Sequence, residues 1–292
     1  MKRLIRSSVD YARRYRPVYA SEEEYLDSDD AEFGDASDVY LSGDIEKEFE
    51  QVTKMLRQTS YEDLGDALED IVHDPKLYTL LAEGFGDGDL ADVKMSSDVV
   101  AIPVTQLLPS QSEIGLDNSL NWPLSGKQSC KNLFQDTVTV ASPIITYRKT
   151  FIIDGHHRWS QLYMMNPEAK ITAINFNYSE ASPYRALRNF QGAIAVANKS
   201  VPKSYSKVNN VYEMSDSAIR NYINSNMSDA CLNDLIDVGV CDDKESAVDY
   251  ILENIKLLQY DNPPFANAPA REYMPQTDKK SVEIARKGQT DI

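Results

Sequence analysis

The stretch from Phe151 to Trp159 constrains this chain more than any other segment. It reads Phe-Ile-Ile-Asp-Gly-His-His-Arg-Trp, with three apolar residues, an Asp-Gly pair and then a run that continues in a helical pattern. This order predicts a strand, a tight turn at Gly155 and the start of a helix. Such a turn aims backbone N–H groups and the positive end of the helix dipole at one point, which makes it a candidate anion site.

The side chains beside this turn suit phosphate chemistry. Two of the three histidines in the chain, His156 and His157, stand here next to Arg158. Histidine can donate to a phosphate oxygen or move a proton near neutral pH, and arginine offers a fixed fork of donors. Asp154 is suited to cap the helix, hold a metal ion or orient a histidine. The plainer alternative makes Asp154 only a cap, packs one histidine in the core and leaves Arg158 in a surface ion pair.

The run Asp154-Gly155-His156-His157-Arg158 resembles the Gly-x-His-Arg turn of the ParB/sulfiredoxin superfamily. The form with an aspartate in front and two histidines is most similar to its kinase branch, the ParB-like free serine kinases. In that superfamily the turn binds nucleotide phosphates, so the resemblance implies phosphate contacts along Gly155, His156, His157 and Arg158. On this basis Asp154 and His156 are also predicted to be catalytic, and Asp154 is the predicted metal ligand.

A second match lies upstream of this turn. Residues 109–113 read Pro-Ser-Gln-Ser-Glu and follow a short β-branched strand that contains Ile102-Pro103-Val104. The superfamily domain opens with an Ile-Pro-Val strand and a Pro-containing loop, and in the kinase branch a glutamate after that loop is the catalytic base. The resemblance therefore implies that Glu113 is a base, and the alternative is a solvated loop carboxylate. A phosphate clamp and a nearby carboxylate are what phosphoryl transfer needs.

Charge and hydropathy narrow the function classes. The chain has 292 residues and a formal net charge of −16, which disfavours non-specific adhesion to DNA or acidic lipid. No apolar run approaches the roughly 20 residues that cross a bilayer, and the basic N-terminus lacks the apolar segment of a secretory signal. The expected location is cytoplasmic: the host cytoplasm, or the virion if the chain is phage-encoded. Three cysteines without Cys-x-x-Cys spacing argue against a disulfide framework or a zinc site.

Five parts are predicted along the chain. Residues 1–43 are basic and then strongly acidic, which is typical of a disordered arm. Residues 44–95 and 180–260 carry helical periodicity, and residues 96–179, which the resemblance covers, combine short strands with one helix. The prolines and charges of residues 261–292 predict an extended tail. The predicted fold class is α+β, a small ParB/sulfiredoxin-like mixed-sheet domain flanked by N-terminal and C-terminal helices.

Local signals place individual elements. Ser182-Pro183 predicts the start of a helix, with the serine as cap and the proline in the first turn. Arg148-Lys149 predicts a hairpin turn between two strands. Residues 116–124 are polar with apolar punctuation and suit a substrate loop. Within it, Trp122 is suited either to stack on a base or sugar or to anchor the loop to the core.

The leading functional hypothesis is a nucleotide-binding enzyme, a kinase that transfers phosphate from ATP or ADP to a hydroxyl of a small molecule or nucleoside. Superfamily members also bind CTP, which stays open as the nucleotide, and Mg²⁺ is the expected metal ion. A second hypothesis is a ParB-like nuclease, although the acidic charge makes DNA a less expected partner. A third is a non-catalytic, phage-type structural or packaged protein that contacts a protein partner through its acidic arm. No membrane partner is expected.

Overall fold

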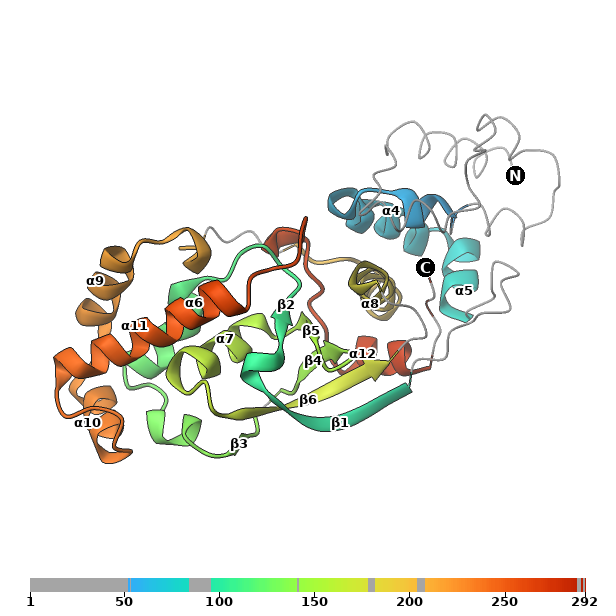
Figure 1. Cartoon of the computed structure of the whole chain (residues 1–292). Coiled ribbons are helices and arrows are strands. Elements are labelled where there is room, and N and C mark those ends of the chain that lie inside the picture. The colour runs from blue at the N-terminus through green and yellow to red at the C-terminus, as the bar shows by residue number, and fades with distance from the viewer. Residues whose placement is uncertain are drawn as a thin grey trace. The chain divides into compact units, whose positions relative to one another are not determined.

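The computed structural model describes residues 52, 54–83, 96–140, 142–177, 182–203, 208–287, 290 and 292 (Figure 1). The arm predicted for residues 1–43 lies outside the described residues. The chain divides into two compact units. The helical unit is drawn from Met1–Ser96, Tyr178–Lys203 and Tyr273–Ile292, and the sheet unit is drawn from Ser97–Asn177 and Ser204–Glu272.

A mixed six-stranded sheet is the framework of the sheet unit. Its strands are β1 (Ser96–Pro103), β2 (Leu108–Pro109), β3 (Thr137–Val138), β4 (Ile144–Tyr147), β5 (Phe151–Asp154) and β6 (Lys170–Asn177). They lie in the order β1-β6-β4-β5-β2, with β3 also pairing with β6. Strands β4 and β5 are antiparallel, whereas β2 with β5, β4 with β6 and β3 with β6 are parallel. The predicted α+β class with a mixed sheet and flanking helices is confirmed.

The hairpin between β4 and β5 forms where the sequence predicts it. Thr150 donates its backbone N–H to the carbonyl of Tyr147 at 3.0 Å. The two residues between them, Arg148 and Lys149, have φ angles of 52° and 55°. Positive φ at both central positions matches the right-handed twist of the flanking strands. This turn therefore fixes the register of β5, the strand that leads into the candidate phosphate site.

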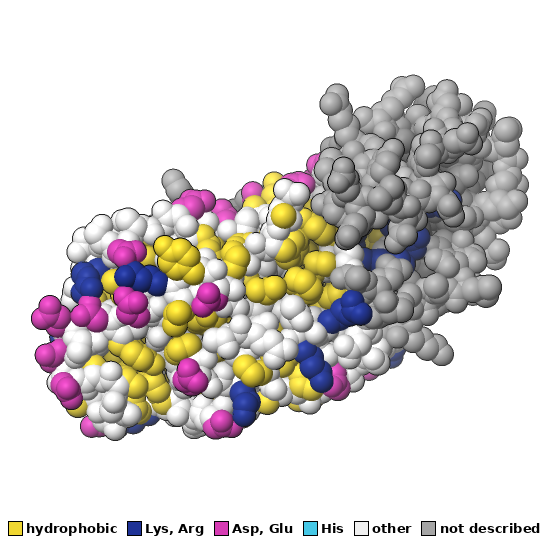
Figure 2. All heavy atoms as spheres, viewed as in Figure 1, with side chains coloured by type: hydrophobic (Ala, Val, Ile, Leu, Met, Phe, Trp, Pro, Cys, Tyr) yellow, Lys and Arg dark blue, Asp and Glu magenta, His cyan; other side chains and the backbone are white. Residues whose placement is uncertain are grey.

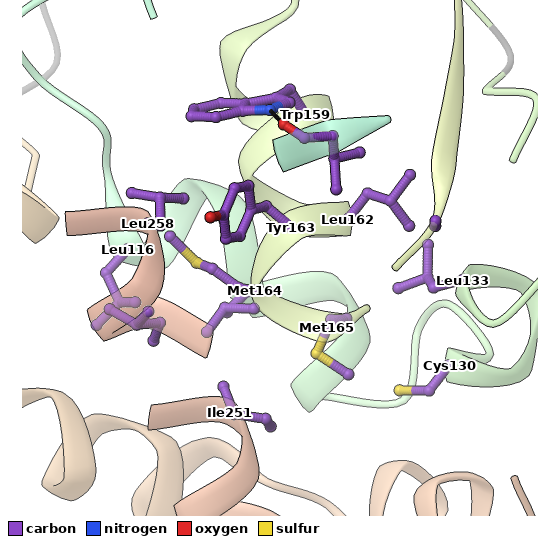
Figure 3. Packing of buried hydrophobic residues seen from close by; sticks show 14 of the residues in the cluster. Leu116, Cys130, Leu133, Trp159, Leu162, Tyr163, Met164, Met165, Ile251 and Leu258 are labelled. Carbon is purple, nitrogen blue, oxygen red and sulfur yellow. Dashed lines mark hydrogen bonds between the residues drawn. The ribbon is translucent and has the colours of Figure 1, made fainter. Parts of the chain in front are cut away.

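Helix α7 (His156–Met165) is the centre of the core of the sheet unit. Figure 3 shows Trp159, Leu162, Tyr163, Met164 and Met165 from α7 among side chains of the surrounding elements. The indole Nε1 of Trp159 donates to the carbonyl of Val104 at 2.8 Å, and its ring packs edge-to-face on Tyr163 at a centroid distance of 5.7 Å. Because α7 is enclosed by packed neighbours, its N-terminus is held in a rigid setting.

Other helices of the sheet unit contribute buried side chains to the same core as α7. They are η2 (Val104–Gln106), α6 (Leu116–Leu124), η3 (Cys130–Leu133), η4 (Val211–Glu213), α9 (Asp216–Asn226), α10 (Asp229–Asp237) and α11 (Lys244–Asp261). The helices expected for α9 to α11 are confirmed. The segment 116–124 is a helix and not the predicted loop. Its Trp122 is 61% exposed, so it does not anchor to the core.

The helical unit contains α4 (Tyr61–His73), α5 (Pro75–Glu83), α8 (Pro183–Asn198) and α12 (Lys279–Arg286), and residues 54–58 before α4 are also helical. Ser182 caps α8 as predicted, because its side chain accepts the N–H of Tyr184 at 3.2 Å. The buried Arg188 of α8 donates to the carbonyls of Leu56 and Thr59 at 2.7 and 2.8 Å. None of the helices in the described part of the chain has the length and apolar character that a membrane span requires.

The predicted extended tail is wrong at its C-terminal end. Residues 279–286 form α12, which begins with a capping box in which the side chain of Asp278 accepts from the N–H of Ser281 at 2.7 Å. Val282 and Ala285 are buried, and α12 packs on α8. The predicted boundary near residue 180 also differs from the division in the structure. Helix α8 belongs to the helical unit, while α9 to α11 complete the core around α7.

All three cysteines are buried free thiols. The sulfur atoms of Cys130 and Cys231 lie 3.3 Å apart inside the sheet unit. The backbone N–H of Cys130 donates to the carboxylate of Asp234 on α10 at 2.8 Å. These contacts join η3 to α10 without a covalent bond.

Candidate functional site

Gly155 forms the turn between β5 and α7. Its φ of 98° lies in the left-handed region, and as N-cap of α7 it makes no side-chain cap. A Cβ at this position would lie 2.6 Å from Cγ2 of Ile144 and 2.9 Å from Nη2 of Arg158. Both the backbone angle and the crowding therefore require glycine. As the N-cap, Gly155 gives no side-chain hydrogen bond to the first N–H groups of α7, which have no partner within the helix itself.

Arg158 lies over this turn and contacts the loop before β4. Its Nη1 donates to the carbonyls of Ser142 and Pro143, the latter at 3.3 Å, and its Nη2 lies 3.7 Å from Oδ2 of Asp154. The side chains of Arg158 and Asp154 are 30% and 23% exposed. The guanidinium is thus held in place at the turn by the protein while part of it still meets solvent.

His156 is buried behind the turn. Its Nε2 accepts the backbone N–H of Ser110 at 3.1 Å, and the hydroxyl of Ser110 lies 3.4 Å from the same nitrogen while donating to the carbonyl of Ile152. Burial, with smaller contributions from His157 and Arg158, holds the pKa of His156 well below its ordinary value. The ring is therefore neutral and ties the 110 loop to α7. The catalytic role of His156 stays a prediction.

His157 differs from its neighbour, because its Nε2 is buried and has no hydrogen-bond partner among the described residues. Burial lowers the pKa of His157 to about 4; the charges of Arg271 and Arg158 act in the same direction, and the carboxylate of Asp117 opposes them. The imidazole is thus neutral near pH 7 and carries a single N–H.

Glu113 lies on the loop that His156 holds through Ser110. Its Oε2 accepts the backbone N–H of Arg271 at 3.4 Å. The same C-terminal segment is fixed by the N–H of Ser112, which donates to the carbonyl of Pro269 at 2.9 Å. The 110 loop and residues 269–271 therefore run together beside α7.

Three residues that the sequence did not single out complete the cluster: Asp117, Asn118 and Arg271. With its amide oxygen turned toward the guanidinium, Asn118 accepts from Nη1 and Nη2 of Arg271 at 2.6 and 3.1 Å. Burial lowers the pKa of Arg271, against the nearby carboxylates of Asp117 and Glu113. No local pattern could have found these residues, because Arg271 lies far along the chain in a stretch that reads as a tail.

The arrangement suits a magnesium ion only in part. Among the described residues, no group of three or more His, Cys, Asp or Glu side chains is placed to hold a metal ion. Magnesium bound with a nucleotide needs just one or two carboxylates, because phosphates and waters supply its remaining ligands. Asp154, partly exposed at the turn, meets that smaller requirement.

Positive charge on one face of the described residues bears on the nuclease hypothesis. On the face shown in Figure 2, the Lys and Arg side chains of the described residues are scattered among acidic and apolar ones instead of forming one band. A phosphate backbone is held by clustered cations, so this face does not favour the nuclease hypothesis.

In comparisons with known proteins, no family model, no curated protein and no solved structure matches the chain. The likeness to the ParB/sulfiredoxin superfamily therefore rests on the residues at 102–113 and 154–158.

Proposed function

We propose that this protein is a nucleotide-binding phosphotransferase that moves a phosphoryl group from ATP or ADP to a hydroxyl of a small molecule or nucleoside. The observation that carries the proposal is the turn at Gly155, where a left-handed glycine without a side-chain cap opens a rigid, buried helix. Backbone N–H groups in that setting bind phosphate, and the helix dipole favours the negative charge.

Side chains around the turn would offset the phosphate charge, hold the metal ion and position the 110 loop. The guanidinium of Arg158, held by the carbonyls of Ser142 and Pro143, offsets phosphate charge at the mouth of the turn. Asp154 would hold Mg²⁺, which when bound supplies charge neutralisation between adjacent phosphate groups. His156 does not need to touch the nucleotide, since its neutral ring fixes the 110 loop that carries Glu113.

Phosphoryl transfer also needs a carboxylate near the acceptor hydroxyl. Two carboxylates from separate elements, Glu113 and Asp117, lie beside Arg271 in this cluster. The cluster adjoins the turn, because the charges of Asp117 and Arg271 both affect the pKa of His157, the second residue of α7. The groups proposed as the phosphate clamp and as the base therefore belong to one region of the sheet unit.

The direct test is nucleotide binding by the full chain. ATP, ADP, CTP and GTP are each titrated with and without Mg²⁺ while thermal unfolding is followed. A nucleotide at a hundred times its dissociation constant stabilises the folded state by about 2.7 kcal/mol. The matched variants are Arg158→Ala at the turn and Arg220→Ala, which removes a surface arginine paired with Asp249 in the same unit.

The expected result is a nucleotide-induced shift in the wild type and in Arg220→Ala that is lost in Arg158→Ala. Because Arg158 also bonds to two carbonyls, the quantity compared is the shift on adding nucleotide and not the melting temperature itself. Transfer is then assayed with γ-labelled ATP and a panel of glycerol, ribose, adenosine and free serine, with water as the background acceptor. Absence of a shift with every nucleotide would rule the proposal out.

A further inference from the structure

Two buried polar atoms of the sheet unit lack a hydrogen-bond partner among the described residues: Oδ1 of Asp117 and Nε2 of His157. The other atoms of this kind in the described part of the chain all belong to the helical unit. Buried polar groups in folded proteins are nearly always paired, because an unpaired one destabilises the folded state. Two such atoms in the same region offer hydrogen-bonding positions that a ligand could fill.

The fold brings these two residues to the starts of two helices that pack on each other. Asp117 is the second residue of α6 and His157 is the second residue of α7. A buried hydrogen bond of 2.7 Å between the hydroxyls of Ser119 and Ser160 joins the two helices just beyond them. The carboxylate of Asp117 is also close enough to raise the pKa of His157. Both unpaired atoms therefore lie at the start of neighbouring helices, beside the turn at Gly155.

The chemistry of the two atoms limits what can bind there. A carboxylate oxygen only accepts, so the ligand must donate a hydrogen to Asp117. With the single N–H of the neutral His157 ring assigned to Nε2, the ring donates there, and the ligand must also accept. A phosphate oxygen meets repulsion at the carboxylate, and an ammonium group has no lone pair to offer. An alcohol hydroxyl donates once and accepts with its lone pairs, and so it fits both atoms.

We propose that Asp117 and His157 bind the hydroxyl that accepts the phosphoryl group, and that Asp117, not Glu113, receives its proton. This inference rests on the proposed function. In the transfer the hydroxyl oxygen forms a bond to the terminal phosphorus of a nucleoside di- or triphosphate. The bond from that phosphorus to the bridging oxygen breaks, and its electron pair leaves with the shortened nucleotide. The hydroxyl proton passes to the carboxylate of Asp117.

Arg271 distinguishes the two carboxylates. Its backbone N–H donates to Oε2 of Glu113, while its guanidinium donates to Asn118, the residue after Asp117. Glu113 therefore has a partner that joins the 110 loop to residues 269–271. Oδ1 of Asp117 has none among the described residues, so it is ready to accept from a ligand. Arg271 acts as a positioning residue: its backbone N–H bonds to Glu113, and its guanidinium bonds to Asn118 at the start of α6.

The test compares two isosteric substitutions in the full chain, Asp117→Asn and Glu113→Gln. Each replaces a carboxylate by an amide of the same shape. Transfer from γ-labelled ATP is measured with the four acceptors of the panel and with water, alongside the thermal shift on adding ATP. General-base catalysis contributes roughly 10²–10⁴-fold. Asp117→Asn should therefore lose at least about 100-fold in kcat and keep the ATP-induced shift, whereas Glu113→Gln should lose less than tenfold.

A third variant, His157→Asn, tests the other half of the site. It should raise the KM for the acceptor while the ATP-induced shift remains. The inference is overturned if Asp117→Asn keeps kcat within tenfold of wild type, or if Glu113→Gln loses as much as Asp117→Asn. It is also overturned if the wild type binds ATP but transfers phosphate to no acceptor, including water. In that last case the nucleotide site stands, but the transferase function fails together with the inference. The inference alone fails when the wild type transfers phosphate and the comparison of Asp117→Asn with Glu113→Gln gives one of the two contrary results.

Discussion

Nε2 of His156 accepts the backbone N–H of Ser110 at 3.1 Å. This bond joins the first residue of α7 to the loop that carries Glu113, two segments that lie apart in the sequence. The hydroxyl of Ser110 adds a bond to the carbonyl of Ile152 in β5. The same pair of residues therefore positions both the turn and the loop. A substitution at His156 or Ser110 should disturb both segments.

Replacing His156 with phenylalanine tests this connection. The ring remains, but the N–H of Ser110 is left buried without its acceptor, which should lower the free energy of unfolding by about 1–3 kcal/mol. Urea unfolding followed by circular dichroism measures the change. His73→Phe, at an exposed position, is the control and should alter stability by less than about 0.5 kcal/mol. Equal stability of the two variants would contradict the role assigned to His156.

Gly155→Ala tests the geometry of the turn. The new Cβ would stand 2.6 Å from Cγ2 of Ile144, in a backbone conformation with φ of 98° that alanine rarely adopts. Gly239→Ala is a matched control, because Gly239 also has a positive φ, of 81°, but has nothing within 4 Å of the added atom. The backbone strain, about 1–3 kcal/mol, is common to both variants. The additional clash with Ile144 should therefore make Gly155→Ala lose clearly more stability than Gly239→Ala in the same urea titration. Losses of the same size would mean that contact with Ile144 is unimportant.

Asn262 is predicted to be a strong determinant of stability. The buried side chain donates to the carbonyls of Thr105 and Leu107 at 2.9 and 2.8 Å, and it accepts from the hydroxyl of Tyr163 at 2.8 Å. Asn262→Ala removes three buried bonds, and at about 1 kcal/mol each the loss should approach 3 kcal/mol. Asn226→Ala, which removes one exposed bond, should be near neutral in the same thermal unfolding assay. A loss below 1 kcal/mol at Asn262 would show that water replaces the lost bonds.

The pH dependence of stability should report on His157. Its pKa is about 4 in the folded state and about 6.5 in the unfolded state, so the unfolded state binds more protons between these values. The contribution to stability is complete above about pH 6.5 and falls as the pH drops toward 4. At about 1.4 kcal/mol per pKa unit, the full loss is near 3 kcal/mol.

The measurement is unfolding by urea from pH 7.5 to 4, with the imidazole signals followed by NMR. The chain has only three histidines, so the signal of His157 is assigned by its absence in His157→Gln. That variant should also show a shallower loss of stability between pH 6.5 and 4. A pKa near 6.5 for His157 would mean that its ring is solvated in solution.

Sequence signals of short range were sufficient for much of the fold. The strand-turn-helix at Gly155, the hairpin at Arg148-Lys149 and the start of α8 at Ser182 all depend on residues within one turn of each other. The α+β class followed from the same patterns. Two predictions were wrong where local signals conflict. Residues 116–124 are polar and contain Pro123, yet they form α6 instead of a loop. The predicted tail contains α12, a short helix that follows a proline-rich run.

The amino-acid sequence by itself determined the turn, because a left-handed backbone angle and a helix start are encoded in neighbouring residues. Only the tertiary structure decided which side chains meet there. It buried His156 against Ser110, left Nε2 of His157 and Oδ1 of Asp117 without partners, and placed Arg271 beside Asn118 and Glu113. Such contacts depend on how helices and loops pack around α7, and packing between distant segments leaves no periodic trace in the sequence.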